Sequence, residues 1–170
     1  FGGGLSSIIF QEIRESKALA YSAYAAYTTP RKPNKSHFIR AYVGTQVDKL
    51  AEAKKAIMEL MNEMPEVEDQ FQDSKIAALK KIETSRTKRS RLFWNYLSAK
   101  EMGRDADINA TIYPQIKELQ LTDLKAFFNN NIAGKNYTYL VIGNKELVKM
   151  DVLKEMGEVQ ELSLEEIFGY

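Results

Sequence analysis

The chain has 170 residues, 44% of them hydrophobic and 28% charged, a mixture typical of one globular domain with a real core. Its formal net charge of +1 gives no overall field favouring nucleic acid or an acidic membrane, and its lack of cysteine excludes disulfides, thiolate metal sites and cysteine nucleophiles. No apolar run approaches the roughly 20 residues that a membrane-spanning helix needs, so we predict no membrane span.

The N-terminal part of the chain is predicted to form a helix followed by a hairpin. Apolar residues recur at helical spacing over residues 5–17, directly after three glycines. Strands are predicted over residues 19–29 and 37–44. The segment 30–35 between them is polar and contains two prolines, and two strands joined by such a short turn predict an antiparallel pair.

A series of helices is predicted after the hairpin. Thr45 and Asp48 have the spacing of a capping box, which would begin a helix that ends at Pro65. Its inward residues are predicted to be Leu50, Ile57, Met61 and Met64. Further helices are predicted from residue 66 to the basic run 85–91, and then over residues 92–102, 108–119 and 122–132.

The last elements are a third strand over residues 137–142 and a capping box formed by Ser163 and Glu166. The order of helix, hairpin, helices and strand predicts an α+β fold, with helices packed on one face of a mostly antiparallel sheet. Three strands are few under so many helices. We therefore expect residues 1–170 to be a single C-terminal domain, truncated so that strands are missing upstream of Phe1.

The most specific motif lies at the N-terminus. Residues 2–22 read GGGLSSIIFQEIRESKALAYS, which predicts a glycine turn, a capped helix, a short turn and a strand. This segment resembles the pitrilysin/insulinase family of zinc peptidases, which includes the mitochondrial processing peptidases. Family members typically carry three glycines, two serines, a helix ending I-R-E-K and then G-L-A-Y-S. Ala18 stands where the family glycine is common, and Ile8 where arginine is common.

The resemblance implies a two-half peptidase in which this chain is the C-terminal, non-catalytic domain. The other half of such enzymes binds zinc through an inverted H-x-x-E-H motif. The half without zinc supplies an arginine and a tyrosine seven residues apart, which correspond here to Arg14 and Tyr21. The resemblance implies that both bind the peptide substrate: a phenol can donate to the developing oxyanion, and a guanidinium can hold a neighbouring carbonyl. From spacing alone, a solvated helix arginine and a strand aromatic would be the favoured interpretation.

The chain itself is expected to be inactive and to hold no metal. A catalytic zinc usually needs three protein ligands, and the one histidine, His37, is predicted to be a surface residue at a strand start. The zinc of the full enzyme is therefore expected on the partner half, which is either joined in cis or a separate subunit. The compartment is left open, with the periplasm or cell envelope as a guess from bacterial relatives.

Two alternative functions and one further expectation accompany this interpretation. The basic run 86–91 precedes aromatic residues, a combination that can bind single-stranded nucleic acid. However, Phe93, Tyr96 and Leu97 lie at helical spacing and predict a core stripe, so we interpret the run as a solvated turn and expect no nucleic-acid partner. A non-proteolytic structural or assembly subunit of the same fold is the second alternative. Finally, we expect self-association of the chain through an unpaired strand edge of the hairpin.

Overall fold

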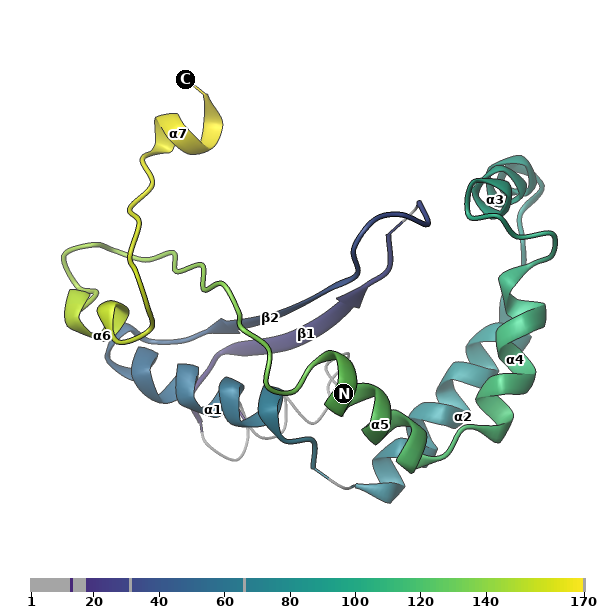
Figure 1. Ribbon diagram of the computed structural model, residues 1–170, viewed down its shortest axis with the longest axis horizontal. Helices are drawn as coiled ribbons and strands as arrows, with labels where there is room; N and C mark the ends of the chain where they lie inside the picture. Colours follow the sequence, from purple (N-terminus) through teal and green to yellow (C-terminus); the bar gives the residue numbers. More distant parts are fainter. Residues whose placement is uncertain (1–12, 14–17, 31, 66, 170) are drawn as a thin grey trace.

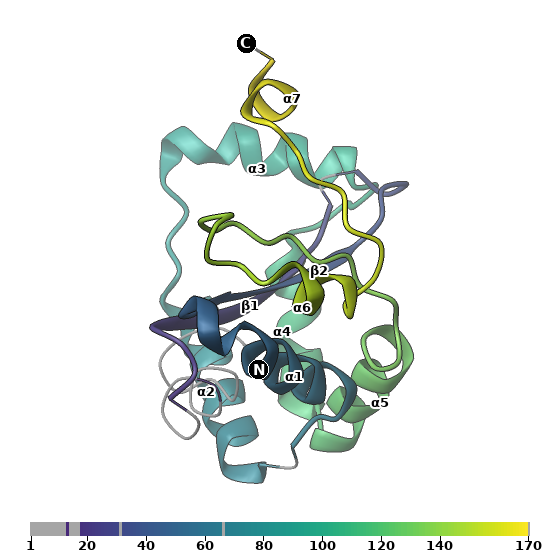
Figure 2. The same ribbon diagram turned by 90° about the vertical axis from the view of Figure 1, so that its left-hand side faces the viewer.

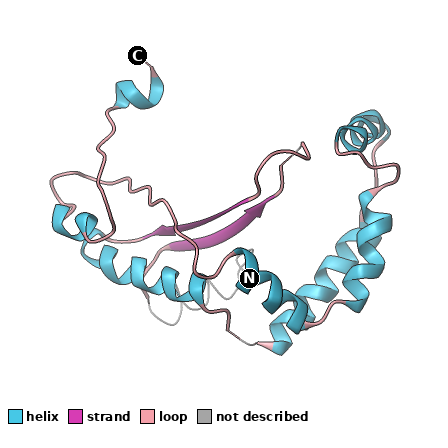
Figure 3. Cartoon of the chain, viewed as in Figure 1, coloured by secondary structure: helices cyan, strands magenta, loops and turns pink. Residues whose placement is uncertain are grey.

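A computed structural model describes residues 13, 18–30, 32–65 and 67–169 of the chain (Figure 1). Its elements follow one another as β1 (Ser22–Thr28), β2 (Phe38–Gly44), a short 3-10 helix η2 (Val47–Lys49), α1 (Leu50–Asn62), α2 (Glu68–Thr84), α3 (Arg89–Glu101), α4 (Ile108–Glu118), α5 (Leu121–Asn131), α6 (Met150–Lys154) and α7 (Leu164–Phe168). Helices and a two-stranded sheet together make an α+β fold, as predicted (Figure 3). The predicted helix over residues 5–17 lies outside the described residues, except for Ile13.

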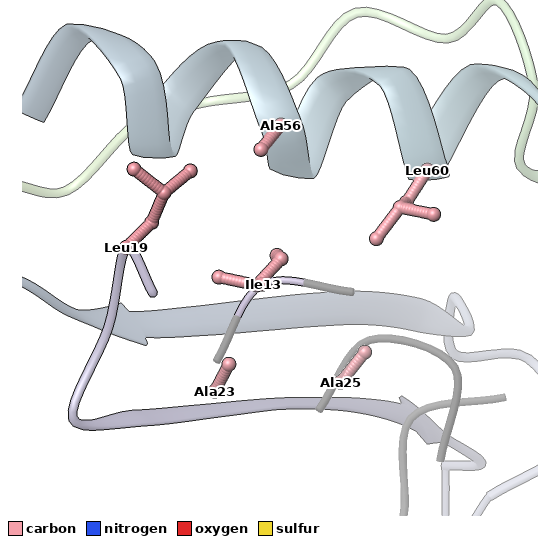
Figure 4. Close-up of a cluster of buried hydrophobic side chains, with 6 residues drawn as sticks. All are labelled: Ile13, Leu19, Ala23, Ala25, Ala56 and Leu60. Atoms are coloured by element: carbon pink, nitrogen blue, oxygen red, sulfur yellow. The ribbon is translucent and has the colours of Figure 1, made fainter. Parts of the chain in front are cut away.

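The two strands form the predicted antiparallel hairpin, with a register that runs from Ser22 opposite Gly44 to Thr28 opposite Phe38. One face of the hairpin packs against α1 (Figure 1). The buried cluster between them is shown in Figure 4 and consists of Ile13, Leu19, Ala23, Ala25, Ala56 and Leu60. Alanines on both the strand and the helix let the two backbones approach closely, and the larger side chains of Ile13 and Leu60 fill the remaining space.

A second buried cluster joins the end of α1 to α5. It contains Met61, Met64, Phe128 and Ile132, all less than one-tenth exposed. Met61 and Met64 are therefore core residues as predicted, whereas Leu50 and Ile57 are only half-buried. α1 ends just before Pro65, also as predicted.

The capping box predicted for Thr45 and Asp48 is wrong. The N-cap of η2 is Gln46, which makes no side-chain cap hydrogen bond. The Thr45 hydroxyl donates instead to the backbone oxygen of Leu19, across the base of the hairpin. The Thr45 hydroxyl therefore donates to a backbone oxygen 26 positions away, instead of accepting from the nearby backbone N–H that a capping box would provide.

α2, α4 and α3 extend away from the hairpin, whereas α5 and α6 lie next to α1 (Figure 1). α2 and α4 pack side by side, and Lys75 Nζ on α2 donates to the Leu119 oxygen just after α4 at 2.9 Å (Figures 1 and 2). α3 lies beyond them and has no buried residue. The core stripe predicted on α3 is therefore wrong: Phe93 and Tyr96 are each 63% exposed and Leu97 is 36% exposed.

The predicted third strand is also wrong. Residues 137–142 have no regular secondary structure and pair with no strand in the described part of the chain. The Tyr137 hydroxyl donates to the Ile132 oxygen at 2.7 Å, which ties the start of this segment to the end of α5. Leu140 and Ile142 are 79% and 90% exposed. A β-prone run alone does not form a strand without a neighbour to complete its hydrogen bonds.

The capping box predicted near the C-terminus is confirmed. Ser163 N donates to Glu166 Oε2 at 2.7 Å, and Glu166 N donates to Ser163 Oγ at 3.1 Å, at the start of α7. Among the residues that the structure describes, no helix has both the length and the apolar character to cross a bilayer.

Candidate functional site

Hydrogen bonds hold the start of β1 to the end of β2 and to Ile13. Tyr21 N donates to the Gly44 oxygen at 2.8 Å, and Leu19 N donates to the Ile13 oxygen at 3.0 Å. The Thr45 hydroxyl closes the other side by donating to the Leu19 oxygen. Because both polar groups of Leu19 are bonded and its side chain is buried, the turn that leads into Tyr21 is fixed in place.

The backbone just before this anchor is strained at Ala18. Its φ of 49° lies in the left-handed region, where a Cβ crowds the following carbonyl. Lys49 Nζ donates to the Ala18 oxygen at 3.2 Å and so holds this peptide unit in place. Glycine would adopt the same conformation without that crowding, which is a physical reason for the glycine that the resembling family commonly has at this position.

We expect Ala18→Gly to stabilise the chain by about 0.5–1 kcal/mol. Relief of the left-handed strain, about 1–2 kcal/mol, outweighs the extra backbone entropy that glycine brings to the unfolded state. Denaturant unfolding followed by circular dichroism measures the difference. Ala26→Gly in β1 is the matched control, since Ala26 has no positive φ, and it should destabilise by about 0.5–1 kcal/mol. Equal losses in both variants would contradict this prediction.

Tyr21 presents its phenol at the surface, where it is 70% exposed. Gln46 Nε2 donates to the phenol oxygen at 2.8 Å. The oxygen therefore acts as an acceptor toward Gln46, and its own hydrogen remains available to donate to a third group. Arg14, the other substrate-binding residue predicted from the sequence, lies outside the described residues.

The hairpin face opposite the core carries aromatic rings. Tyr24 and Tyr42, directly opposite each other in the register, stack with ring centroids 5.3 Å apart. Arg40 lies on the same face opposite Ala26 and is exposed. This face thus offers apolar rings and one cation, while Ala23 and its neighbours on the other face are buried in the core.

The described residues provide no donor set for a metal ion. The described part of the chain contains no group of three or more His, Cys, Asp or Glu side chains that could hold a metal ion. His37 is exposed, as predicted, and its ring lies 5.6 Å from that of Tyr27. These residues do not fit a catalytic zinc, so we derive no chemical step through one on this chain.

An open cleft of about 530 Å³ lies between α1 and α6, away from Tyr21. Its lining mixes lysine, glutamate and methionine side chains, including Lys54, Glu155 and Met156. Lysine and glutamate in one open cleft can pair with each other, and no sequence motif points to them. We assign no chemistry to this cleft.

The sequence predicted a role for Tyr21 but not for the residue that bonds to its phenol oxygen. Gln46 belongs to no motif, and 25 positions separate it from Tyr21. The signal that could have found it was the hairpin register: pairing Ser22 with Gly44 places the residues just beyond each strand next to one another.

Comparison with known proteins bears on the first half of the chain. Residues 1–82 match a family model described as the Peptidase M16 inactive domain. This match confirms the resemblance to the pitrilysin/insulinase peptidases that the N-terminal motif indicated. No curated protein matches the chain.

Proposed function

We propose, from the match of residues 1–82 to the Peptidase M16 inactive domain, that this chain helps to bind a peptide in an active site whose zinc lies on another domain or subunit. The observation that carries the proposal is the exposed phenol of Tyr21, whose oxygen is held by Gln46. Arg14 and Tyr21 are the proposed substrate-binding residues.

The proposed chemistry of Tyr21 follows from its hydrogen bonding. Negative charge develops on the carbonyl oxygen of a peptide bond under attack, and a fixed hydroxyl donor stabilises it. The bond from Gln46 restricts the position of the Tyr21 oxygen, and the anchored backbone of residues 19–21 restricts the position of the ring. A donor that is fixed in advance loses little entropy at the transition state, so Tyr21 is suited to this role.

Arg14 and Tyr21 would act together on the bound peptide. Arg14, seven residues before Tyr21, would hold a neighbouring carbonyl through its guanidinium. This arrangement gives binding and orientation, while hydrolysis belongs to the partner half.

The chain alone should therefore bind no stoichiometric zinc and cleave no peptide. Metal analysis of the purified chain, together with a fluorogenic peptide assay, measures both. Adding the zinc-bearing half should produce cleavage that neither part shows alone. One tightly held zinc per isolated chain, still present after any purification tag is removed, would contradict the proposal.

An assembly subunit without proteolysis is the second candidate, and the exposed aromatic residues of α3 favour it. Such a surface is typical of protein contacts. The two candidates differ in one observation: a proteolytic assembly has H-x-x-E-H in the full-length protein or its partner, and an assembly-only relative lacks it in both.

A further inference from the structure

α3 exposes an apolar surface that nothing in the described part of the chain covers. Figures 1 and 2 show the helix at the edge of the molecule, beyond α2 and α4. None of its residues is buried, and Leu92, Phe93, Trp94 and Tyr96 are each between 55% and 63% exposed. Four large apolar side chains on one short helix are more than scattered surface residues, and they indicate a binding surface.

The same segment is strongly basic. Residues 85–100 contain five lysines or arginines and no acidic residue, although the whole chain has a net charge of only +1. Lys100 pairs with Asp105 at 3.3 Å. Within the described residues, Arg86, Lys88, Arg89 and Arg91 form no ion pair. The ligand that fits α3 is therefore apolar and acidic at once.

The chain carries a segment of that composition at its other end. Residues 158–169 contain four glutamates and no basic residue. Leu164 and Ile167, three positions apart on α7, are 70% and 55% exposed. The hydrogen bonds from Ser163 lower the pKa of Glu166, so this carboxylate is charged at neutral pH. Acidic and apolar side chains of α7 thus match the basic and apolar ones of α3.

α7 and α3 lie at opposite ends of the same molecule (Figure 1). A contact between them within one chain would need a large rearrangement, whereas a contact between two chains does not. In a pair related by a two-fold axis, α7 of each copy would meet α3 of the other, so the same contact forms twice and the assembly closes. In such a closed pair, α3 and α7 of both copies are covered by contacts, and neither stays exposed.

We propose that two copies of this chain associate through reciprocal docking of residues 158–169 on α3. Leu164 and Ile167 would pack on Leu92 and Tyr96, which lie four positions apart on one face of α3. Glutamates of the segment other than Glu161, which pairs with Lys145, would face the arginines at the start of α3. Complementary charge mainly raises the rate and specificity of association, while the apolar contacts hold the pair together. This inference is independent of the proposed peptide-binding role and concerns different residues from Tyr21 and Arg14.

Charge exchange between the two surfaces tests the proposal. One variant carries R89E and R91E on α3, and another carries E158K and E165K in the acidic segment. Each variant alone removes most of the opposite charge at both contacts of its own dimer, because two of the five basic residues in the segment 85–100, or two of the four glutamates in the acidic segment, change sign. We expect its dimer dissociation constant to rise at least 10-fold. In an equimolar mixture, the mixed dimer has one contact between unaltered surfaces and one in which the exchanged charges face each other, so dimers should return. Sedimentation velocity over a concentration series measures the masses of the species in each sample.

K80E with K81E on α2 is the matched control and should dimerise like the unaltered chain. Recovery on mixing cannot arise from misfolded variants, so it separates docking from loss of structure. The proposal is overturned if the unaltered chain stays monomeric to high concentration, or if all variants dimerise equally, as pairing of hairpin edges would predict. Binding of a single-stranded oligonucleotide that R89E with R91E abolishes, without any dimer, would assign α3 to nucleic acid instead.

Discussion

Tyr21→Phe is expected to lower the kcat of the peptidase that contains this chain by about 100- to 1,000-fold, with little change in KM. Phenylalanine keeps the ring but removes the hydroxyl that would donate to the developing oxyanion. Because that hydrogen bond strengthens as charge develops, its loss affects the transition state more than the bound substrate. Steady-state kinetics on a peptide, with this chain assembled with its zinc-bearing half, measures the effect.

Tyr24→Phe is the matched control for this experiment. Tyr24 lies on the same strand, and its ring stacks on Tyr42, so the variant loses a hydroxyl and keeps its packing. Its kcat should stay within about twofold of the unaltered enzyme. Arg14→Ala should raise KM as well as lower kcat, because a guanidinium that holds a neighbouring carbonyl also contributes to substrate binding. Wild-type cleavage by both Tyr21→Phe and Arg14→Ala would refute the proposed roles.

The parts of the fold that were predictable from the sequence depend on local signals. Two prolines and a polar turn separate the strands of the hairpin, and the observed strands begin and end within three residues of the predicted ones. α1 stops before Pro65 because proline restricts the residue before it and cannot donate to the preceding turn. The capping box of Ser163 and Glu166 needs only neighbouring residues, so it was predictable as well.

The errors concern elements that need a partner. The spacing of Phe93, Tyr96 and Leu97 indicates an apolar stripe, but periodicity does not say whether another element packs on that stripe. Residues 137–142 have strong β propensity, yet a strand requires an adjacent edge. Both segments are apolar and exposed for the same physical reason: the surface that would bury them is absent from the described part of the chain.

The candidate site was predictable in part for a similar reason. The motif over residues 2–22 pointed to Tyr21 through family resemblance, which needs no knowledge of the fold. The positions of Gln46 and Thr45 depend on the register of the hairpin, which brings residues about 25 positions apart into hydrogen-bonding distance. Hence the local capping interpretation of Thr45 was wrong, although its hydroxyl does make a structural bond.

Phe128→Ala is expected to destabilise the chain by about 3–5 kcal/mol, the largest effect on stability that we predict. Phe128 is 2% exposed and fills the cluster that joins α5 to the end of α1, where it lies among Met61, Met64 and Ile132. Removing the ring leaves a cavity that these side chains can close only in part. Since a domain of this size is stable by about 5–15 kcal/mol, the variant should unfold at a much lower denaturant concentration.

Phe127→Ala separates burial from the mere loss of a phenylalanine on the same helix. Phe127 is 41% exposed and makes an edge-to-face contact with Tyr27, with ring centroids 5.5 Å apart. Such a contact contributes about 0.5–1.5 kcal/mol, and the exposed part of the ring loses little when it is removed. Urea unfolding followed by far-ultraviolet circular dichroism should therefore give a loss at least twofold larger for Phe128→Ala. Equal losses would mean that α5 does not anchor the helical half of the chain to α1 through this cluster.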